Sequence, residues 1–253
     1  MSHVHSWRRP IFSLAPALFL VLLAVGPTRA AYQASLDSNE SAFQPPCVDF
    51  VDSLPAKMLK AAGTAFTKLG YTTGSFTKAS FTRSHTIART AGDWAYYVHS
   101  HGDYYWHSGD QRRWSGFRED GGDCSQAVVY SKDIALKRDG RATNLVVIST
   151  CHNAEANTTL PAAFGIPKTK SPADGWQGPT FYLGYLGSAF DSDEWVFEQR
   201  FWDALSTVHS VGQAFDIASL GSFGHADFAA DWWGSYAWYG IAGPVVFNCP
   251  RCL

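Results

Sequence analysis

The stretch NLVVISTCHN, Asn144 to Asn153, decides the predicted fold of this 253-residue chain. It contains an unbroken and mostly β-branched apolar run, Leu145 to Ile148. Such a run is too short for a helix that buries itself, but it suits a strand buried on both faces of a parallel sheet. The run ends in polar residues, among which Cys151 has the greatest chemical interest. We therefore expect an α/β fold with Cys151 just beyond a central strand.

A second segment shows the same pattern, because DWAYYV, Asp93 to Val98, is apolar from Trp94 onward and leads directly into the polar sequence HSHGD, His99 to Asp103. In open α/β sheets, reactive side chains collect beyond the carboxyl ends of neighbouring strands. If the two strands are neighbours, a histidine and Cys151 lie at one edge of the sheet. A short helix through Lys137 would provide the crossover that parallel pairing requires.

The first thirty residues have the features of an export signal. Two arginines precede a largely apolar block, Ile11 to Gly26, and small residues up to Ala30 suit a cleavage site. We therefore divide the chain into a signal peptide (1–30), a loose polar leader (31–46) and one domain (47–253), located in the periplasm or outside the cell. An uncleaved signal anchor is the alternative. No other apolar stretch could cross a bilayer, so we expect no stable membrane span after cleavage.

Composition indicates a globular protein and limits its partners. Hydrophobic residues make up 46% of the chain and charged residues 17%. The formal net charge of −2 gives no electrostatic reason to expect a nucleic acid as partner. We expect a monomer.

Five cysteines give an odd number in a chain predicted to be exported. Two disulfides could form among four of them, which would leave Cys151 free, although the pairing cannot be deduced from the sequence. These four are Cys47, Cys124, Cys249 and Cys252.

A free cysteine near a histidine is a basis for nucleophilic catalysis. A thiol is a poor nucleophile until it ionises, and a nearby imidazole promotes ionisation and later protonates the leaving group. A glycine beside the histidine lets backbone N–H groups approach the oxyanion of a tetrahedral intermediate. The pair His101-Gly102 and Cys151 have the residue types that this chemistry needs.

The order of these motifs resembles the caspase and gingipain group of cysteine peptidases. In that group a strand ends in His-Gly, and a second strand ends in small residues and a cysteine about fifty residues later, as His101-Gly102 and Cys151 do here. The segments FWDAL (201–205) and VGQAF (211–215) are similar to helices of gingipain-like domains, and YGIAGP (239–244) resembles their final strand. Gly243 is a departure, since an aspartate is usual at that position.

The resemblance implies a caspase-like three-layer α/β/α sandwich around a mostly parallel sheet. It also implies cleavage of protein or peptide substrates through an acyl-enzyme, with no metal and no cofactor. Cys151 would be the nucleophile and His101 the general base and acid. The backbone N–H groups of Gly102 and Cys151 would form the oxyanion hole, and Asp103 could orient His101.

Two other functions stay open. The spacing of His99, His101 and Asp103 matches the start of a zinc-binding signature, and His152 or His209 could add a ligand. Tyr104 stands where that signature has its last histidine, which counts against a zinc-dependent hydrolase. The third possibility is an inactive caspase-like domain that is exported for binding.

Overall fold

The structure is a computed structural model. It describes residues 32–45, 47, 53–121, 127–138, 143–155, 157–166, 180–188, 191–207, 211, 213–215 and 217–218, together with the backbone of 235–240. All elements below belong to one unit, residues 31–253.

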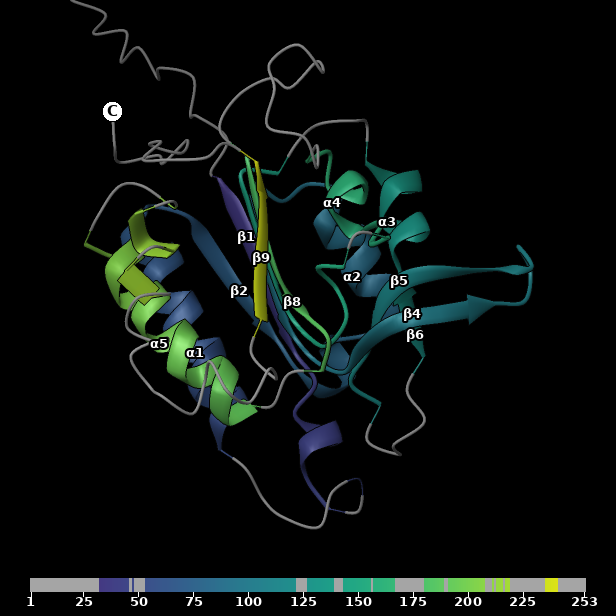
Figure 1. Cartoon of the computed structure of the whole chain (residues 1–253), viewed down its shortest axis with the longest axis horizontal. Helices are drawn as coiled ribbons and strands as arrows, with labels where there is room; N and C mark the ends of the chain where they lie inside the picture. The colour runs from purple at the N-terminus through teal and green to yellow at the C-terminus, as the bar shows by residue number, and fades with distance from the viewer. Residues whose placement is uncertain are drawn as a thin grey trace, which may run out of the picture. The chain divides into compact units, whose positions relative to one another are not determined.

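A mostly parallel sheet forms the centre of this unit (Figure 1). Five strands run parallel, and the sixth, β9, pairs antiparallel with β8 at one edge. In spatial order the strands are β2 (Thr72–Phe76), β1 (Gln33–Ser38), β3 (Ala95–His99), β7 (Leu145–Ser149), β8 (Phe181–Leu186) and β9 (Ser235–Gly240). The predicted α/β class with a mostly parallel sheet is confirmed.

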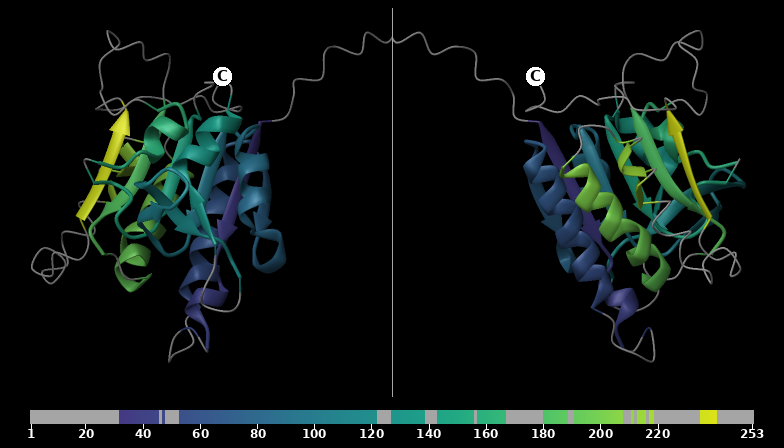
Figure 2. Two further views of the ribbon diagram at one scale, coloured as in Figure 1. Left: turned by 90° about the vertical axis from the view of Figure 1, so that its right-hand side faces the viewer. Right: turned by 60° about the vertical axis from the view of Figure 1, so that its left-hand side comes forward.

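Helices cover both faces of the sheet and complete a three-layer sandwich (Figure 1, Figure 2). On one face lie α1 (Leu54–Lys68) and α5 (Asp191–Leu205). On the other lie α2 (Arg83–Thr90), α3 (Ser131–Lys137) and α4 (Leu160–Ala163). Two short 3₁₀ turns, η1 (Ser41–Phe43) and η2 (Lys78–Ser80), follow β1 and β2.

Successive side chains of the central strands point to opposite faces of the sheet and so contribute to two hydrophobic cores. In β3, Tyr97 faces the cluster under α1 and α5, whereas Tyr96 and Val98 face the cluster under α2, α3 and α4. In β7, Val147 faces the cluster under α1 and α5, and Ile148 faces the cluster on the opposite side. A strand that is buried on both faces must be apolar throughout, which explains the unbroken runs in the sequence.

A second, three-stranded antiparallel sheet occupies much of the connection between β3 and β7, and the sequence analysis did not predict it. Its strands are β4 (Gly102–His107), β5 (Arg112–Arg118) and β6 (Val128–Tyr130). The hairpin of β4 and β5 extends away from the main sheet (Figure 1). The predicted crossover helix follows it as α3, which ends at Lys137 as expected.

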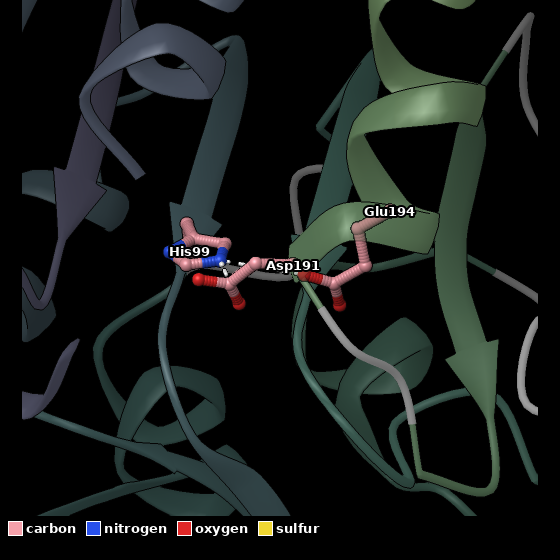
Figure 3. A group of neighbouring side chains, drawn as sticks. All are labelled: His99, Asp191 and Glu194. Atoms are coloured by element: carbon pink, nitrogen blue, oxygen red, sulfur yellow. Dashed lines mark hydrogen bonds and ion pairs between the residues drawn. The ribbon is translucent and has the colours of Figure 1, made fainter. Parts of the chain in front are cut away.

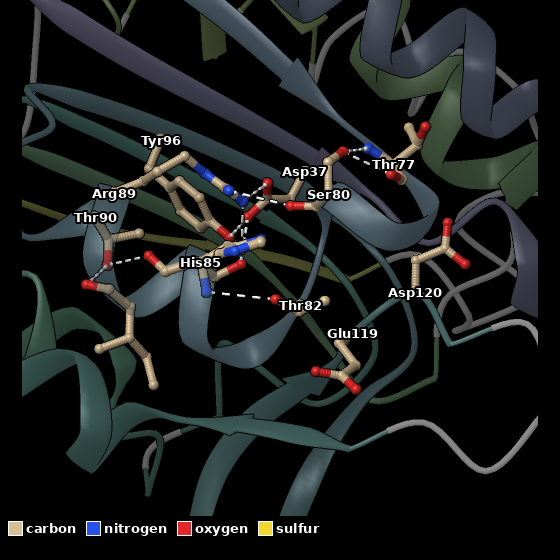
Figure 4. Close-up of polar contacts among 12 residues, drawn as sticks. Asp37, Thr77, Ser80, Thr82, His85, Arg89, Thr90, Tyr96, Glu119 and Asp120 are labelled. Atoms are coloured by element: carbon tan, nitrogen blue, oxygen red, sulfur yellow. Dashed lines mark hydrogen bonds and ion pairs between the residues drawn. The ribbon is translucent and has the colours of Figure 1, made fainter.

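The predicted leader at residues 31–46 is wrong, because this segment contains β1 and η1. The strand lies between β2 and β3, and five of its six residues are buried. Its polar residues concealed it, but buried partners satisfy them. Asp37 accepts hydrogen bonds from the hydroxyls of Tyr96 and Thr86 and pairs with Arg89 at 2.7 Å (Figure 4). The sheet therefore begins before the predicted domain start at residue 47.

The segments that resemble gingipain-like domains are described in part. FWDAL (201–205) is the last part of α5, so the helix that the resemblance implied there is confirmed. In VGQAF (211–215), residue 212 lies outside the described residues, and YGIAGP (239–244) is described only at 239–240, the end of β9. Within the described part of the chain, no helix is long and apolar enough to cross a membrane.

Asp93 allows a test of the buried electrostatics beside β3. Burial raises the pKa of Asp93 to about 7, aided by Asp37 and opposed by Ser35, Arg89 and Arg138. Because the folded-state pKa lies above the unfolded value, wild-type stability falls as pH rises from about 4 to about 7. We expect Asp93→Asn to lack this fall, so that its stability relative to wild type increases by roughly 2–4 kcal/mol across that window.

Urea unfolding of both proteins at a series of pH values measures the difference. Asp203→Asn is the matched control, because Asp203 is exposed. A difference between Asp93→Asn and wild type that does not change with pH would contradict the assigned pKa.

Candidate active site

The two predicted site strands are direct neighbours. Strand β3 pairs in parallel with β7, and the register places His99 opposite Ser149. The N–H of Ser100 donates to the carbonyl of Ser149 at 3.2 Å, which continues the pairing beyond the strand ends. Two residues further along each strand, His101 and Cys151 leave the sheet at the same edge.

The backbone of Gly102 lies against the turn that carries Cys151. A Cβ atom at this position would come within 2.6 Å of the Cys151 carbonyl oxygen, and closer still to side-chain atoms of Thr150 and Asn153. Every other residue type would therefore force the two segments apart. The sequence analysis expected this glycine to let backbone N–H groups approach an oxyanion, which stays a prediction; the contact with the Cys151 turn was not predicted.

Cys151 is a partly buried thiol that takes part in no disulfide, and it lies on a turn that β8 and its following residues hold in place. The N–H of His152 donates to the Gly187 carbonyl at 2.8 Å, and His152 has a positive φ of 59°. Glu155 accepts from the N–H of Gly187 at 3.1 Å and pairs with the His152 ring at 2.6 Å. The side chain of His152 therefore pairs with Glu155, and this contact stabilises the turn.

His101 is exposed, and the segment after β1 positions its ring. The carbonyl of Ala42 forms a hydrogen bond with the ring, and the ring of Phe43 packs against it with 4.8 Å between the centroids. Partial burial, and then the charge of His99, lower the pKa of His101. A lowered pKa favours the neutral imidazole, which is the form that can accept a proton.

Asp103 has a different contact in the structure from the one that the sequence suggested. It is exposed, and its carboxylate accepts from the N–H of Tyr104 at 2.6 Å. Ala42 is the orienting partner that the structure gives to His101. A role for Asp103 in orienting His101 stays a prediction.

His99 is buried and turned toward the start of α5 (Figure 3). Its Nε2 atom lies 3.2 Å from a carboxylate oxygen of Asp191 and 3.3 Å from one of Glu194. Burial alone would lower the pKa of His99, but the hydrogen bonds and charges of the two carboxylates outweigh it and raise the pKa to about 10. His99 is therefore a charged group beside the site.

The zinc set suggested by the sequence is not assembled. Among the described residues, one group of histidine, cysteine, aspartate and glutamate side chains converges closely enough to hold a metal ion, and it consists of His99, Asp191 and Glu194. Neither His101 nor Asp103 belongs to it. His209 lies outside the described residues.

Sequence reasoning missed four residues around the site. Ala42 and Phe43 were missed because their segment was assigned to the leader, although Phe43 packs against both His99 and His101. Asp191 and Glu194 lie ninety residues or more from His99 in sequence, and an acidic helix start carries no signal that names its partner.

The pairing of the remaining cysteines stays a prediction. Cys124, Cys249 and Cys252 lie outside the described residues.

Comparison with known proteins identifies the fold. No protein-family model and no curated protein matches the sequence. In structure the chain is similar to the Arg-specific cysteine proteinase gingipain R of Porphyromonas gingivalis, at 11% identity and a TM-score of 0.55. This match covers 86% of the present chain and 48% of gingipain R, so the chain spans about half of that protein's length.

The Drosophila initiator caspase Dronc is similar over nearly the whole of both chains. The match covers 98% of this chain and 97% of Dronc, with 10% identity and a TM-score of 0.52. At such low identities the likeness shows the fold alone. The chain therefore has a caspase-like α/β/α fold, as its sequence motifs suggested.

Gly102 provides a test of the contact between the two segments. We expect Gly102→Ala to lower the free energy of unfolding by about 1–3 kcal/mol, because the added methyl group overlaps the backbone of Cys151. Chemical denaturation monitored by tryptophan fluorescence measures the change.

Gly63→Ala is the matched control. A Cβ atom at Gly63, inside α1, would meet only Leu36 at an ordinary 3.6 Å. This variant should gain about 0.5–1 kcal/mol, because alanine is the better helix former. Equal effects of the two substitutions would show that Gly102 is not tightly enclosed.

Proposed function

We propose that this chain is an exported cysteine peptidase in which His101 and Cys151 form a catalytic dyad. One observation carries the proposal: the in-register parallel pairing of β3 with β7, which brings the two residues to one edge of the sheet. The close approach of Gly102 to the Cys151 turn supports it. The substrates would be proteins or peptides.

The dyad would cleave a peptide bond in two steps. His101 takes the proton from the Cys151 thiol, and the thiolate attacks the carbonyl carbon to form a tetrahedral intermediate. The intermediate collapses to a thioester while the imidazolium protonates the departing amine. Water, deprotonated by His101, then hydrolyses the thioester and restores the thiol.

The backbone geometry around Gly102 suits an oxyanion hole. The N–H of Arg118 donates to the His101 carbonyl, and in an antiparallel ladder hydrogen-bonded and non-hydrogen-bonded pairs alternate. The next pair, Gly102 with Phe117, is therefore of the non-hydrogen-bonded kind. The N–H of Gly102 consequently points away from β5, where it could donate to a developing oxyanion. The N–H of Cys151 is the second predicted donor.

The surroundings of the dyad favour the neutral form of His101. Partial burial is the main cause of its lowered pKa, and the positive charges of His99 and Arg118 lower the pKa further. The charge of Asp191 and the hydrogen bond with Ala42 act in the opposite direction but do not outweigh them. A neutral imidazole at physiological pH is ready to accept the thiol proton. His99 and Arg118 would thus support the catalytic base without reacting themselves.

Thiol reactivity tests the dyad without knowledge of the substrate. We expect iodoacetamide to label Cys151 rapidly at neutral pH, and labelling to slow at least about tenfold in His101→Ala, because the imidazole favours the thiolate. Peptide mapping by mass spectrometry assigns the label to Cys151. His85→Ala, which changes an exposed histidine on α2, is the matched control and should label like wild type.

Hydrolysis of a mixed fluorogenic peptide library tests the complete reaction. Cys151→Ala should keep the fold and lose about 10³-fold or more of the turnover, since the nucleophile is removed. Full turnover in this variant would rule out the mechanism. Slow labelling of a folded wild-type chain, unaffected by His101→Ala, would instead favour an inactive binding domain.

Export is the second part of the proposal, and it rests on the charged front end and apolar block of residues 1–30. In a secreting host we expect the exported protein to begin at Ala31, as N-terminal sequencing would show. Replacement of the apolar block by a polar sequence should retain the chain inside the cell. An intact N-terminus on the exported protein would favour a signal anchor.

A further inference from the structure

The side chains of His99, Asp191 and Glu194 form a buried cluster that makes and breaks no bond in the proposed reaction (Figure 3). It lies beside His101, since the ring of Phe43 packs against both histidines. His99 comes from the end of β3, and the two carboxylates come from the first turn of α5. The side chains of His99 and Glu194 are 1% and 4% exposed, and that of Asp191 is 15% exposed. One imidazole nitrogen and two carboxylate oxygens lie within 4.8 Å of one another.

The single hydrogen on Nε2 of His99 cannot form a full hydrogen bond with both carboxylates of the cluster. Both carboxylates face the same Nε2 atom of His99, which carries at most one hydrogen. Among the described residues, no lysine or arginine lies within 4.0 Å of either carboxylate. With His99 protonated and both acids ionised, the cluster would keep a net negative charge in a buried place, which is costly. Burial accordingly raises the pKa of Glu194 to about 7, so that without a cation this acid tends to keep a proton.

The described residues that hydrogen-bond with Glu198 supply no positive charge that could balance the two carboxylates of the cluster. Glu198, one turn further along α5, is also buried. Its carboxylate accepts hydrogen bonds from the hydroxyls of Tyr97 and Tyr185 and from the indole of Trp202. These donors are uncharged, so they satisfy Glu198 without adding a positive charge to the cluster.

We propose that His99, Asp191 and Glu194 bind a divalent cation of the zinc type. In a tetrahedral zinc site, metal–ligand distances of about 2.0–2.2 Å place neighbouring ligand atoms about 3.3–3.5 Å apart. The two nitrogen–oxygen distances, 3.2 and 3.3 Å, already match this spacing. The two carboxylate oxygens lie within 4.8 Å of each other, and a bound cation would draw them closer. The cation would replace the proton on Nε2 and neutralise the two carboxylates. An imidazole ligand favours zinc over calcium or magnesium.

The burial of the ligands favours a structural role for the cation, with a water in the fourth tetrahedral position that the three side chains leave open. A catalytic zinc needs an open position that a substrate can reach, whereas here the histidine and one carboxylate are almost fully buried. The metal would fasten the start of α5 to the end of β3. Phe43 packs with 4.8 Å between ring centroids against both His99 and His101, so a metal that fixes His99 also fixes the wall beside the dyad.

The other nitrogen of His99 limits the expected affinity. Its Nδ1 atom is buried and has no hydrogen-bond partner. Histidine ligands usually donate their second N–H to an acceptor, and loss of that bond costs roughly 10–100-fold in metal affinity. We therefore expect binding weaker by about this factor than in a fully supported site.

The test measures zinc binding by the full-length chain carrying Cys151→Ala, which prevents zinc from binding the thiol. Isothermal titration with zinc sulfate, and elemental analysis after dialysis, compare this parent with Asp191→Asn and Glu194→Gln made in it. We expect the parent to bind one more equivalent of zinc than either variant, and zinc to raise the unfolding temperature of the parent more. Asp203→Asn, which changes an exposed residue near the end of α5, is the matched control and should bind like the parent.

Cobalt(II) binding to the parent tests the site even if the Asp191 and Glu194 variants fail to fold. Bound to the parent, it should show the visible bands of a tetrahedral site with nitrogen and oxygen ligands, and zinc should remove them. Parent and both variants binding equal amounts of zinc would place the metal elsewhere. A parent that binds no zinc would show that the three side chains form an ion pair only. An octahedral cobalt spectrum would contradict the proposed tetrahedral zinc-type site. None of these outcomes depends on peptidase activity.

Discussion

The parallel pairing of β3 with β7 is the constraint on which the rest of the candidate site depends. Backbone hydrogen bonds set the register, and the register determines where both strands leave the sheet. A slip of one residue would turn every side chain on the strand to the opposite face, which both buried cores forbid. The positions of His101 and Cys151 at one edge are therefore consequences of packing deep inside the sheet.

The segments around this edge reinforce one another. Strand β4 begins at Gly102, so the first residue of the small antiparallel sheet is also the residue that contacts the Cys151 turn. The residues after β8 hold the other side of that turn through Gly187. The end of β1 supplies Ala42 and Phe43 beside His101. Four strands of the central sheet thus contribute to one small region.

Buried charge is arranged differently on the two faces of the sheet. Under α2, the carboxylate of Asp37 has a guanidinium and two hydroxyl groups as partners, so its charge and hydrogen bonds are both satisfied. At the start of α5, one imidazole faces two carboxylates. The first arrangement is complete as it stands. The second has one imidazole for two carboxylates, and burial raises the pKa of Glu194 to about 7, so its acids need a further proton or a cation. The contrast is the physical reason for assigning a cation to the second cluster alone.

The sequence by itself determined the central strands and the order of the reactive residues, because a strand buried on both faces requires an unbroken apolar run and ends where polar residues begin. It did not determine β1, because the polar residues of that strand are paired inside the protein with partners such as Tyr96 and Arg89, far along the chain. Only the tertiary structure decided that Ala42 contacts His101 and that His99 faces Asp191 and Glu194. These contacts join segments distant in sequence, and no local pattern of residues encodes which distant segment becomes a neighbour.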